Sequence, residues 1–161
     1  METLDMTANN LRALVVDDAP AMRQLLRIVL RGIGISDVME AEYGDEALAK
    51  LADRDSVHPD FIICDLHMGE MPGIEFIYRL RQSRSVANPG VPVIVLTGED
   101  DPAVLDAATG VGANSVRRKP IMPRLLREDI ESSLGYRVAG PHCPPTLEAA
   151  WSYSGKGSII A

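Results

Sequence analysis

The chain has 161 residues, of which 46% are hydrophobic and 24% are charged, a composition typical of a globular protein with one core. Sixteen Lys and Arg residues against 23 Asp and Glu residues give a formal net charge of −7, which argues against nonspecific binding of nucleic acid or of an anionic membrane. No apolar run approaches the length of a transmembrane helix, and the acidic, polar start is unlike a signal peptide. We therefore expect a cytoplasmic protein.

Strand and helix patterns alternate along the chain. The expected strand at 11–18 precedes a helix at 19–32, and the strand at 37–41 precedes a helix at 44–53. Strands at 60–65, 91–98 and 114–120 are followed by helices at 73–83, 101–112 and 122–135. In the first helix, apolar residues recur at helical spacing, Pro20 suits the first turn and Gly32 is the expected C-cap.

The predicted fold is a doubly wound α/β fold with a five-stranded parallel sheet. The strands lack polar alternation, which indicates that helices cover both faces, and short links between βα units imply right-handed crossovers. We expect a polar lead at 1–10, one domain at 11–135 and a C-terminal extension at 136–161. This extension is too apolar for a solubilising tail, so we expect it to pack on its own domain or on a neighbouring copy; its apolar residues include Leu147, Trp151, Tyr153, Ile159 and Ile160.

Polar residues follow the carboxyl ends of four strands, where function gathers in such sheets. They are Asp17, Asp18, Asp65, Thr97 and Lys119. Three carboxylates repel one another and need a cation, and oxygen ligands favour a hard metal, Mg²⁺ or Mn²⁺. A lysine and a hydroxyl add donors suited to a transferring phosphoryl group. No nucleotide-binding glycine motif is present.

Each of these residues also has an ordinary explanation. The acidic pair could cap the first helix, Asp65 and Thr97 could belong to turns, and Lys119 could be solvated. The coincidence of all five at strand ends favours a site. Cys64, inside an apolar run, is expected to be a core residue, and with Cys143 it forms no metal-binding spacing.

The motifs "VVDD", "IICDLHM", "VIVLTGE" and "RRKP", in this order and with Gly73 eight residues after Asp65, occur within residues 11–135. This region resembles a response-regulator receiver domain of the CheY-like family, which has a flavodoxin-like fold and serves two-component signalling and phosphorelays. The resemblance implies that Asp65 accepts a phosphoryl group from a phosphohistidine of a sensor histidine kinase or a histidine phosphotransfer protein.

The resemblance also implies the roles of the other residues. Asp18, Asp65 and the backbone carbonyl of His67 would ligate Mg²⁺, with Asp17 acting mostly through water. Lys119 and Thr97 would bind oxygens of the phosphoryl group. His67 and Glu99 lie where the family tunes the lifetime of the aspartyl phosphate, and we expect a modulatory role. The protein would catalyse its own Mg²⁺-dependent phosphorylation and dephosphorylation without being an enzyme for another substrate.

Three features depart from the family pattern. Gly69 and Pro72 replace a proline and an aspartate in the loop after Asp65, so we expect a less rigid loop. Val116 stands where the family usually has Tyr or Phe, which puts the usual aromatic readout in question. Arg117 and Arg118 either are solvated charges that discourage edge pairing or contribute to a partner or dimer surface, formed by the helices at 101–112 and 122–135 and the strand at 114–120.

The first hypothesis is a single-domain response regulator that binds a downstream protein target when phosphorylated, with a homodimer through that surface or the extension as a further possibility. The alternative is a phosphorylation-independent adaptor or dimerisation module that retains the fold. A weaker third hypothesis is a small α/β hydrolase or flavin protein, although the chain has no nucleophile elbow. No nucleic-acid or membrane partner is expected.

Overall fold

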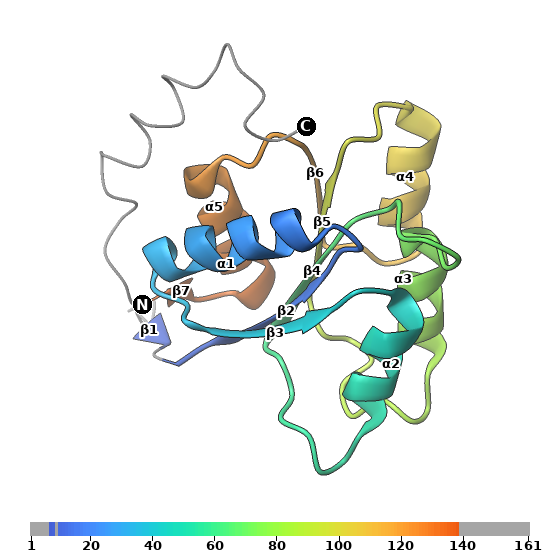
Figure 1. Ribbon diagram of the computed structural model, residues 1–161, viewed down its shortest axis with the longest axis horizontal. Helices are drawn as coiled ribbons and strands as arrows, with labels where there is room; N and C mark the ends of the chain where they lie inside the picture. The colour runs from blue at the N-terminus through green and yellow to red at the C-terminus, as the bar shows by residue number, and fades with distance from the viewer. Residues whose placement is uncertain (1–6, 9, 139–161) are drawn as a thin grey trace, which may run out of the picture.

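The computed structural model describes residues 7–8 and 10–138. Five βα units follow one another: β2 (Arg12–Val16) and α1 (Pro20–Ile33), β3 (Asp37–Ala41) and α2 (Gly44–Ala52), β4 (Phe61–Cys64) and α3 (Gly73–Gln82), β5 (Val93–Thr97) and α4 (Pro102–Gly110), β6 (Ser115–Arg118) and α5 (Pro123–Leu134) (Figure 1). Short strands β1 (Thr7–Ala8) and β7 (Arg137–Val138) flank them. The predicted alternation is confirmed.

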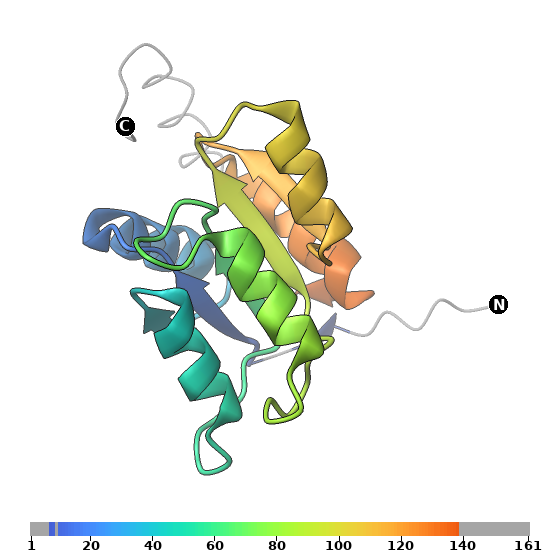
Figure 2. The same cartoon turned by 90° about the vertical axis from the view of Figure 1, so that its right-hand side faces the viewer.

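The five strands of the main sheet are all parallel and lie in the order β3-β2-β4-β5-β6. Helices α1 and α5 cover one face, and α2, α3 and α4 cover the other (Figures 1 and 2). The chain order reverses beside β2, because β3 lies on one side of it and β4 on the other. This is the predicted doubly wound fold, and ligands of such sheets bind beyond the carboxyl ends of the strands at this reversal.

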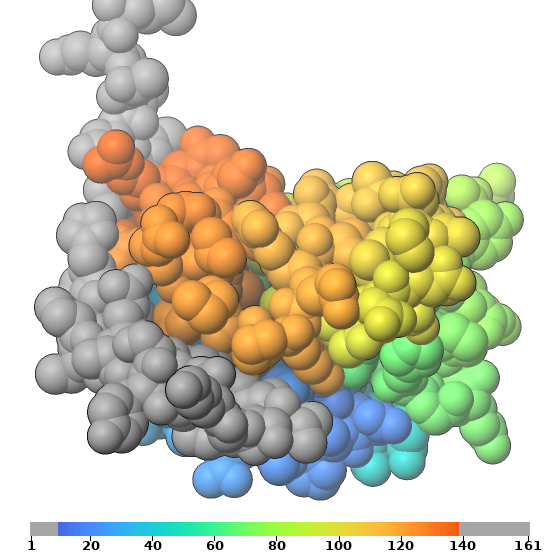
Figure 3. Space-filling model, turned by 90° about the horizontal axis from the view of Figure 1, so that it is seen from above, coloured from blue at the N-terminus to red at the C-terminus, as the bar shows by residue number. Residues whose placement is uncertain are grey.

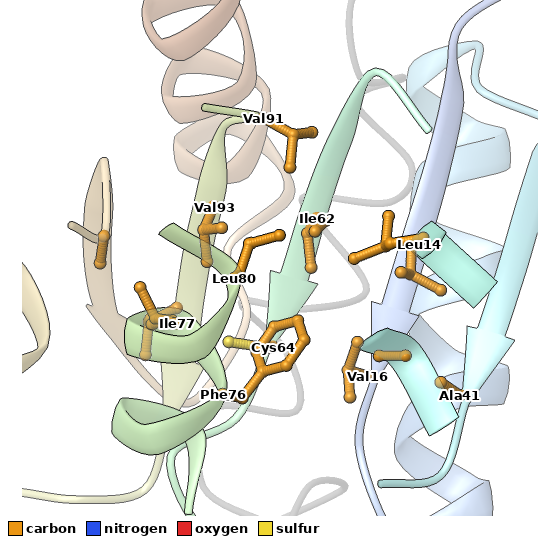
Figure 4. Packing of buried hydrophobic residues seen from close by; sticks show 14 of the residues in the cluster. Leu14, Val16, Ala41, Ile62, Cys64, Phe76, Ile77, Leu80, Val91 and Val93 are labelled. Atoms are coloured by element: carbon orange, nitrogen blue, oxygen red, sulfur yellow. The ribbon is translucent and has the colours of Figure 1, made fainter. Parts of the chain in front are cut away.

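The strand "FIIC" is buried along its whole length. Ile62 and Cys64 face the core under α3, whereas Phe61 and Ile63 belong to the core under α1 and α5. Figure 4 shows Ile62 and Cys64 near Phe76 and Leu80 of α3. The alternation across two covered faces explains why the strand reads as one apolar run, and it confirms Cys64 as a core residue.

The end of the first helix corrects one prediction. Helix α1 continues to Ile33, and its C-cap is Gly34, not Gly32. Gly34 has a φ of 109°, and its N–H donates to the carbonyls of Leu30 and Arg31. Ile33 is fully buried, so the apolar face of the helix includes one residue beyond Gly32 before a left-handed glycine ends it.

A second, two-stranded sheet was not predicted. Strands β1 and β7 pair in parallel, with Thr7 opposite Arg137 and Ala8 opposite Val138. Val138 is 3% exposed, and the Arg127 guanidinium donates to its carbonyl at 3.0 Å. These short strands lie in the segments expected to be a polar lead and an extension, where two residues give no periodicity to recognise. The expected packing of the rest of the extension, including Cys143, falls outside the described residues.

In the described part of the chain, none of the helices has the length and apolar character needed to cross a membrane.

Candidate phosphoacceptor site

Neighbouring strands fix the backbone at the acidic edge of the sheet. The N–H of Asp17 donates to the carbonyl of Ala41, and the N–H of Asp65 donates to the carbonyl of Val16, both at 3.2 Å. Asp17 and Asp65 are therefore each the first residue after a buried strand. The register between β2 and β4 aligns Val16 with Cys64, and this register brings Asp17 and Asp65 to the same edge, as predicted.

Asp65 is bound on both of its carboxylate oxygens. Lys119 Nζ lies 2.9 Å from Oδ2, and the backbone N–H of His67 donates to Oδ1 at 3.2 Å. Lys119 Nζ also lies 3.6 Å from Asp17 Oδ2. The ammonium group thus lies between two carboxylates, and Asp65 remains 8% exposed, which leaves a route for an incoming group.

Burial raises the pKa of Asp17, and the charges of Asp65 and Asp18 raise it further. The N–H of Ala19, which donates to Asp17 Oδ1 at 2.9 Å, and the ammonium of Lys119 oppose that shift. Repulsion from the other carboxylates therefore raises the pKa of Asp17, as the sequence predicts, but burial raises it more. The backbone carbonyl of Asp17 accepts a hydrogen bond at 2.6 Å from Arg23, a contact that no motif in the sequence indicated.

The carboxylate oxygens at this edge suit Mg²⁺, which keeps several water ligands, better than a metal whose ligands all come from the protein. Over residues 7–8 and 10–138, no three His, Cys, Asp or Glu side chains are gathered as a metal centre, and Asp18 is exposed. Mg²⁺ retains waters and is usually bound by one or two carboxylates together with phosphate oxygens. The carboxylates of Asp17 and Asp65 match that pattern. The individual ligand assignments, including Asp18 and the carbonyl of His67, stay predictions.

Thr97 and Lys119 are joined through the backbone. The N–H of Lys119 donates to the carbonyl of Thr97 at 2.7 Å, and a cis peptide bond links Lys119 to Pro120. Thr97 is fully buried, and its Oγ1 accepts the N–H of Glu99 at 3.1 Å. The hydroxyl only accepts in this bond, so its O–H remains available to donate to another group.

His67 and Glu99 contact each other across the mouth of the site. His67 Nε2 lies 2.8 Å from Glu99 Oε2, and the His67 side chain is 65% exposed. The pKa of Glu99 is lowered, first by the backbone N–H of Asp101 and then by the hydrogen bond with His67. The sequence placed both residues near the site but gave no sign that they contact each other, because 32 residues separate them.

Two glycines shape the loop after Asp65. Gly69 has a φ of 54°, a left-handed conformation that the proline usual in the family could not adopt. A Cβ on Gly73 would lie 2.2 Å from the carbonyl oxygen of Asp65. Gly73 is therefore required by the close approach of α3 to the backbone of Asp65.

Arg117 is paired within the domain, and its role at a partner surface stays a prediction. Its guanidinium contacts both carboxylate oxygens of Asp129 on α5, at 2.7 and 3.0 Å. This bond raises the pKa of Arg117 and joins β6 to α5. Arg118 is exposed, and Val116 is half-buried against the core under α3 and α4.

Segments far apart in the sequence lie side by side on the face of the molecule that Figure 3 shows. In Figure 3, α4 (yellow) and the orange segments after it lie beside green segments from the middle of the chain.

Residues 13–131 match the response regulator receiver domain, and the chain belongs to this family. Among its curated relatives, a chemotaxis protein CheY homologue of Campylobacter jejuni is 34% identical over 125 residues, covering 78% of this chain and 93% of the relative. Chemotaxis protein CheY1 of Helicobacter pylori is 35% identical over 126 residues, covering 78% and 98%. The resemblance identified from the motifs is confirmed, and it supports phosphoacceptor signalling in general.

Solved structures agree with the sequence relatives. The chemotaxis protein CheY4 of Vibrio cholerae has a TM-score of 0.66 and 31% identity, over 78% of this chain and 99% of that one. A CheY-like response regulator receiver domain protein of Methanospirillum hungatei has a TM-score of 0.68 and 27% identity, over 79% and 95%. These similarities confirm the flavodoxin-like fold.

Proposed function

We propose that Asp65 accepts a phosphoryl group from a phosphohistidine of a sensor histidine kinase or histidine phosphotransfer protein, and that the phosphorylated protein binds a downstream protein target. The observation that carries this proposal is the bonding of Asp65: Lys119 contacts one carboxylate oxygen at 2.9 Å and the His67 N–H contacts the other. A carboxylate at the rim of the sheet, held beside a cation, is suited to attack at phosphorus.

In the proposed step, an oxygen of Asp65 forms a bond to phosphorus while the bond from phosphorus to the histidine nitrogen breaks. The leaving imidazole keeps the electron pair, and the product is an aspartyl phosphate. Lys119 then exchanges its contact with Asp65 for an oxygen of the phosphoryl group. Mg²⁺ bound by Asp17, Asp18, Asp65 and the carbonyl of His67 would neutralise charge on the phosphoryl oxygens.

Thr97 is proposed to report the phosphorylation. When its hydroxyl moves to donate to a phosphoryl oxygen, the N–H of Glu99 that is bound to Oγ1 draws the segment between β5 and α4 along with it. Val116 is half-buried beside α4 and cannot swing as an aromatic ring would. Movement of α4 itself is therefore the proposed signal to a target, or to a second copy, at the surface of α4, β6 and α5.

The test is incubation of the full chain with Mg²⁺ and acetyl phosphate, followed by intact-protein mass measurement. We expect the mass of one phosphoryl group on the wild type and none on Asp65→Asn. Asp100→Asn, an exposed neighbour of the site, is the matched control and should be phosphorylated normally. Absence of the added mass on the wild type, or its persistence on Asp65→Asn, contradicts the proposal.

The half-buried Val116, which stands in place of the usual aromatic residue, favours one alternative function, a phosphorylation-independent adaptor. The two functions are separated by recovering partner proteins on immobilised wild type with and without acetyl phosphate. A set of partners that changes on phosphorylation supports the switch. An unchanged set on fully phosphorylated protein supports the adaptor.

A further inference from the structure

A surface hollow lies beside the acidic edge, between the start of α2, the loop before α3 and α3 itself. Figure 2 shows α2 and α3 side by side with this loop next to them. The hollow has a volume of about 640 Å³, and it is lined by Tyr43, Asp45, residues 69–71, Glu75 and Arg79. We call it the α2–α3 hollow.

The charges of the α2–α3 hollow do not balance. Arg79 is its one cationic lining residue, and it is paired with Glu75 at 2.7 Å within α3. The carboxylates of Asp45 and Glu70 remain. Both residues are exposed, and across the described residues no cation contacts either one. The hollow therefore presents two negative charges that an incoming cation can neutralise.

Tyr43 adds an aromatic surface beside those charges, and it is 41% exposed. Its ring lies next to Gly69, because a Cβ at that position would lie 3.0 Å from its Cε1 atom. On the other side, a Cβ on Gly44 would lie 2.8 Å from the sulfur of Met71. The start of α2 and the loop before α3 therefore lie next to each other at the hollow, and glycine at both positions leaves room for Tyr43 and Met71.

We propose that the α2–α3 hollow binds an arginine-bearing peptide segment of a protein partner. A guanidinium can stack on the exposed ring of Tyr43 while it donates hydrogen bonds to Asp45 and Glu70. The volume exceeds that of a single side chain and admits a short stretch of backbone. Nucleic acid and anionic membranes are repelled by the same charges, and the described residues gather no metal centre here.

None of the lining residues belongs to the acid, lysine and threonine set at the strand ends, although residues 69–71 lie in the loop that follows Asp65. The hollow gives the chain a second surface for a partner, on the side of α2 and α3. Binding to it is expected in the unphosphorylated protein and in Asp65→Asn.

The experiment is fluorescence anisotropy of a fluorescein-labelled Gly-Arg-Gly-Arg-Gly peptide titrated with the full chain. The double variant Asp45→Asn/Glu70→Gln should weaken binding about fivefold, as expected for two exposed charge pairs. Tyr43→Leu should weaken it about threefold, whereas Tyr43→Phe, which keeps the ring, should bind as the wild type does.

The matched control is Asp106→Asn/Glu128→Gln, which removes two exposed charges of α4 and α5 and should leave the affinity unchanged. An equal loss of affinity in this control would identify general attraction to an acidic protein and overturn the proposal. Absence of saturable binding to the wild type, or undiminished binding to Tyr43→Leu and the double variant, overturns it as well. Circular dichroism of each variant confirms that the fold is intact.

Discussion

Substitution of Gly73 by alanine tests how closely α3 approaches the backbone of the phosphoacceptor. A Cβ at this position would lie 2.2 Å from the carbonyl oxygen of Asp65 and 2.8 Å from the Cα of Leu66. Both are backbone atoms, so no side-chain rotation relieves the overlap. Gly73 does not have a positive φ, which means that the contact, and not backbone strain, opposes the alanine.

The magnitude follows from two opposing effects. Insertion of a methyl group into a packed region costs roughly 1–3 kcal/mol, while alanine in a helix gains up to about 1 kcal/mol over glycine. Because the overlap is with backbone atoms, the cost lies near the upper end of its range, and we expect Gly73→Ala to lower the free energy of unfolding by about 2 kcal/mol. In urea, with an m-value of about 1.5 kcal/mol/M, the midpoint falls by about 1 M.

Gly110→Ala is the matched control, because nothing lies within 4 Å of the added Cβ and the residue ends α4. This variant should be as stable as the wild type or slightly more stable. Gly73→Ala should also slow phosphorylation by acetyl phosphate, since its relaxation moves Asp65. A Gly73→Ala protein with wild-type stability and wild-type phosphorylation would refute the reasoning.

Three further predictions concern charge and burial. The pKa of Asp17 is raised, so the folded state binds more protons than the unfolded state. The contribution of Asp17 to stability therefore falls as the pH rises above the ordinary pKa of 3.8. Without Mg²⁺, Asp17→Asn should be more stable in urea than the wild type at pH 7 and equal to it near pH 3. Asp129→Asn removes the paired contact with Arg117 and should lower the free energy of unfolding by about 0.5–1 kcal/mol in thermal or urea denaturation. Burial raises the pKa of the Cys64 thiol well above its usual range, so in a Cys143→Ser background iodoacetamide should alkylate Cys64 only after unfolding, as followed by mass.

Each of these predictions has a result that contradicts it. An Asp17→Asn protein less stable than the wild type at pH 7 would mean that the Lys119 contact outweighs burial. Glu128→Gln changes an exposed neighbour of Asp129 and should be close to neutral; equal losses for the two variants would show that the Arg117 contact contributes nothing particular. Alkylation of Cys64 at the same rate in folded and urea-unfolded protein would disprove its burial.

Periodicity was sufficient to predict most of the fold, because strands β2, β4 and β5 are continuous apolar runs and the longer helices repeat an apolar face. Strand β6, with Val116 as its one apolar residue, follows from the alternation of the other units. The errors lie where the local signal is short. Either Gly32 or Gly34 could be the C-cap of α1 by its sequence, and only the burial of Ile33 shows that the helix ends before Gly34. Two-residue strands β1 and β7 have no period, and their pairing joins segments 130 residues apart.

The candidate site was predictable to the level of its residues, since the carboxyl ends of parallel strands meet at one edge. The sequence by itself determined that Asp17, Asp65, Thr97 and Lys119 would gather there. Only the tertiary structure decided that Lys119 lies between two carboxylates, that His67 contacts Glu99, and that Arg117 binds Asp129. Strand order fixes which backbones are neighbours, whereas contacts between side chains depend on rotamers, burial and loop paths that no local pattern encodes.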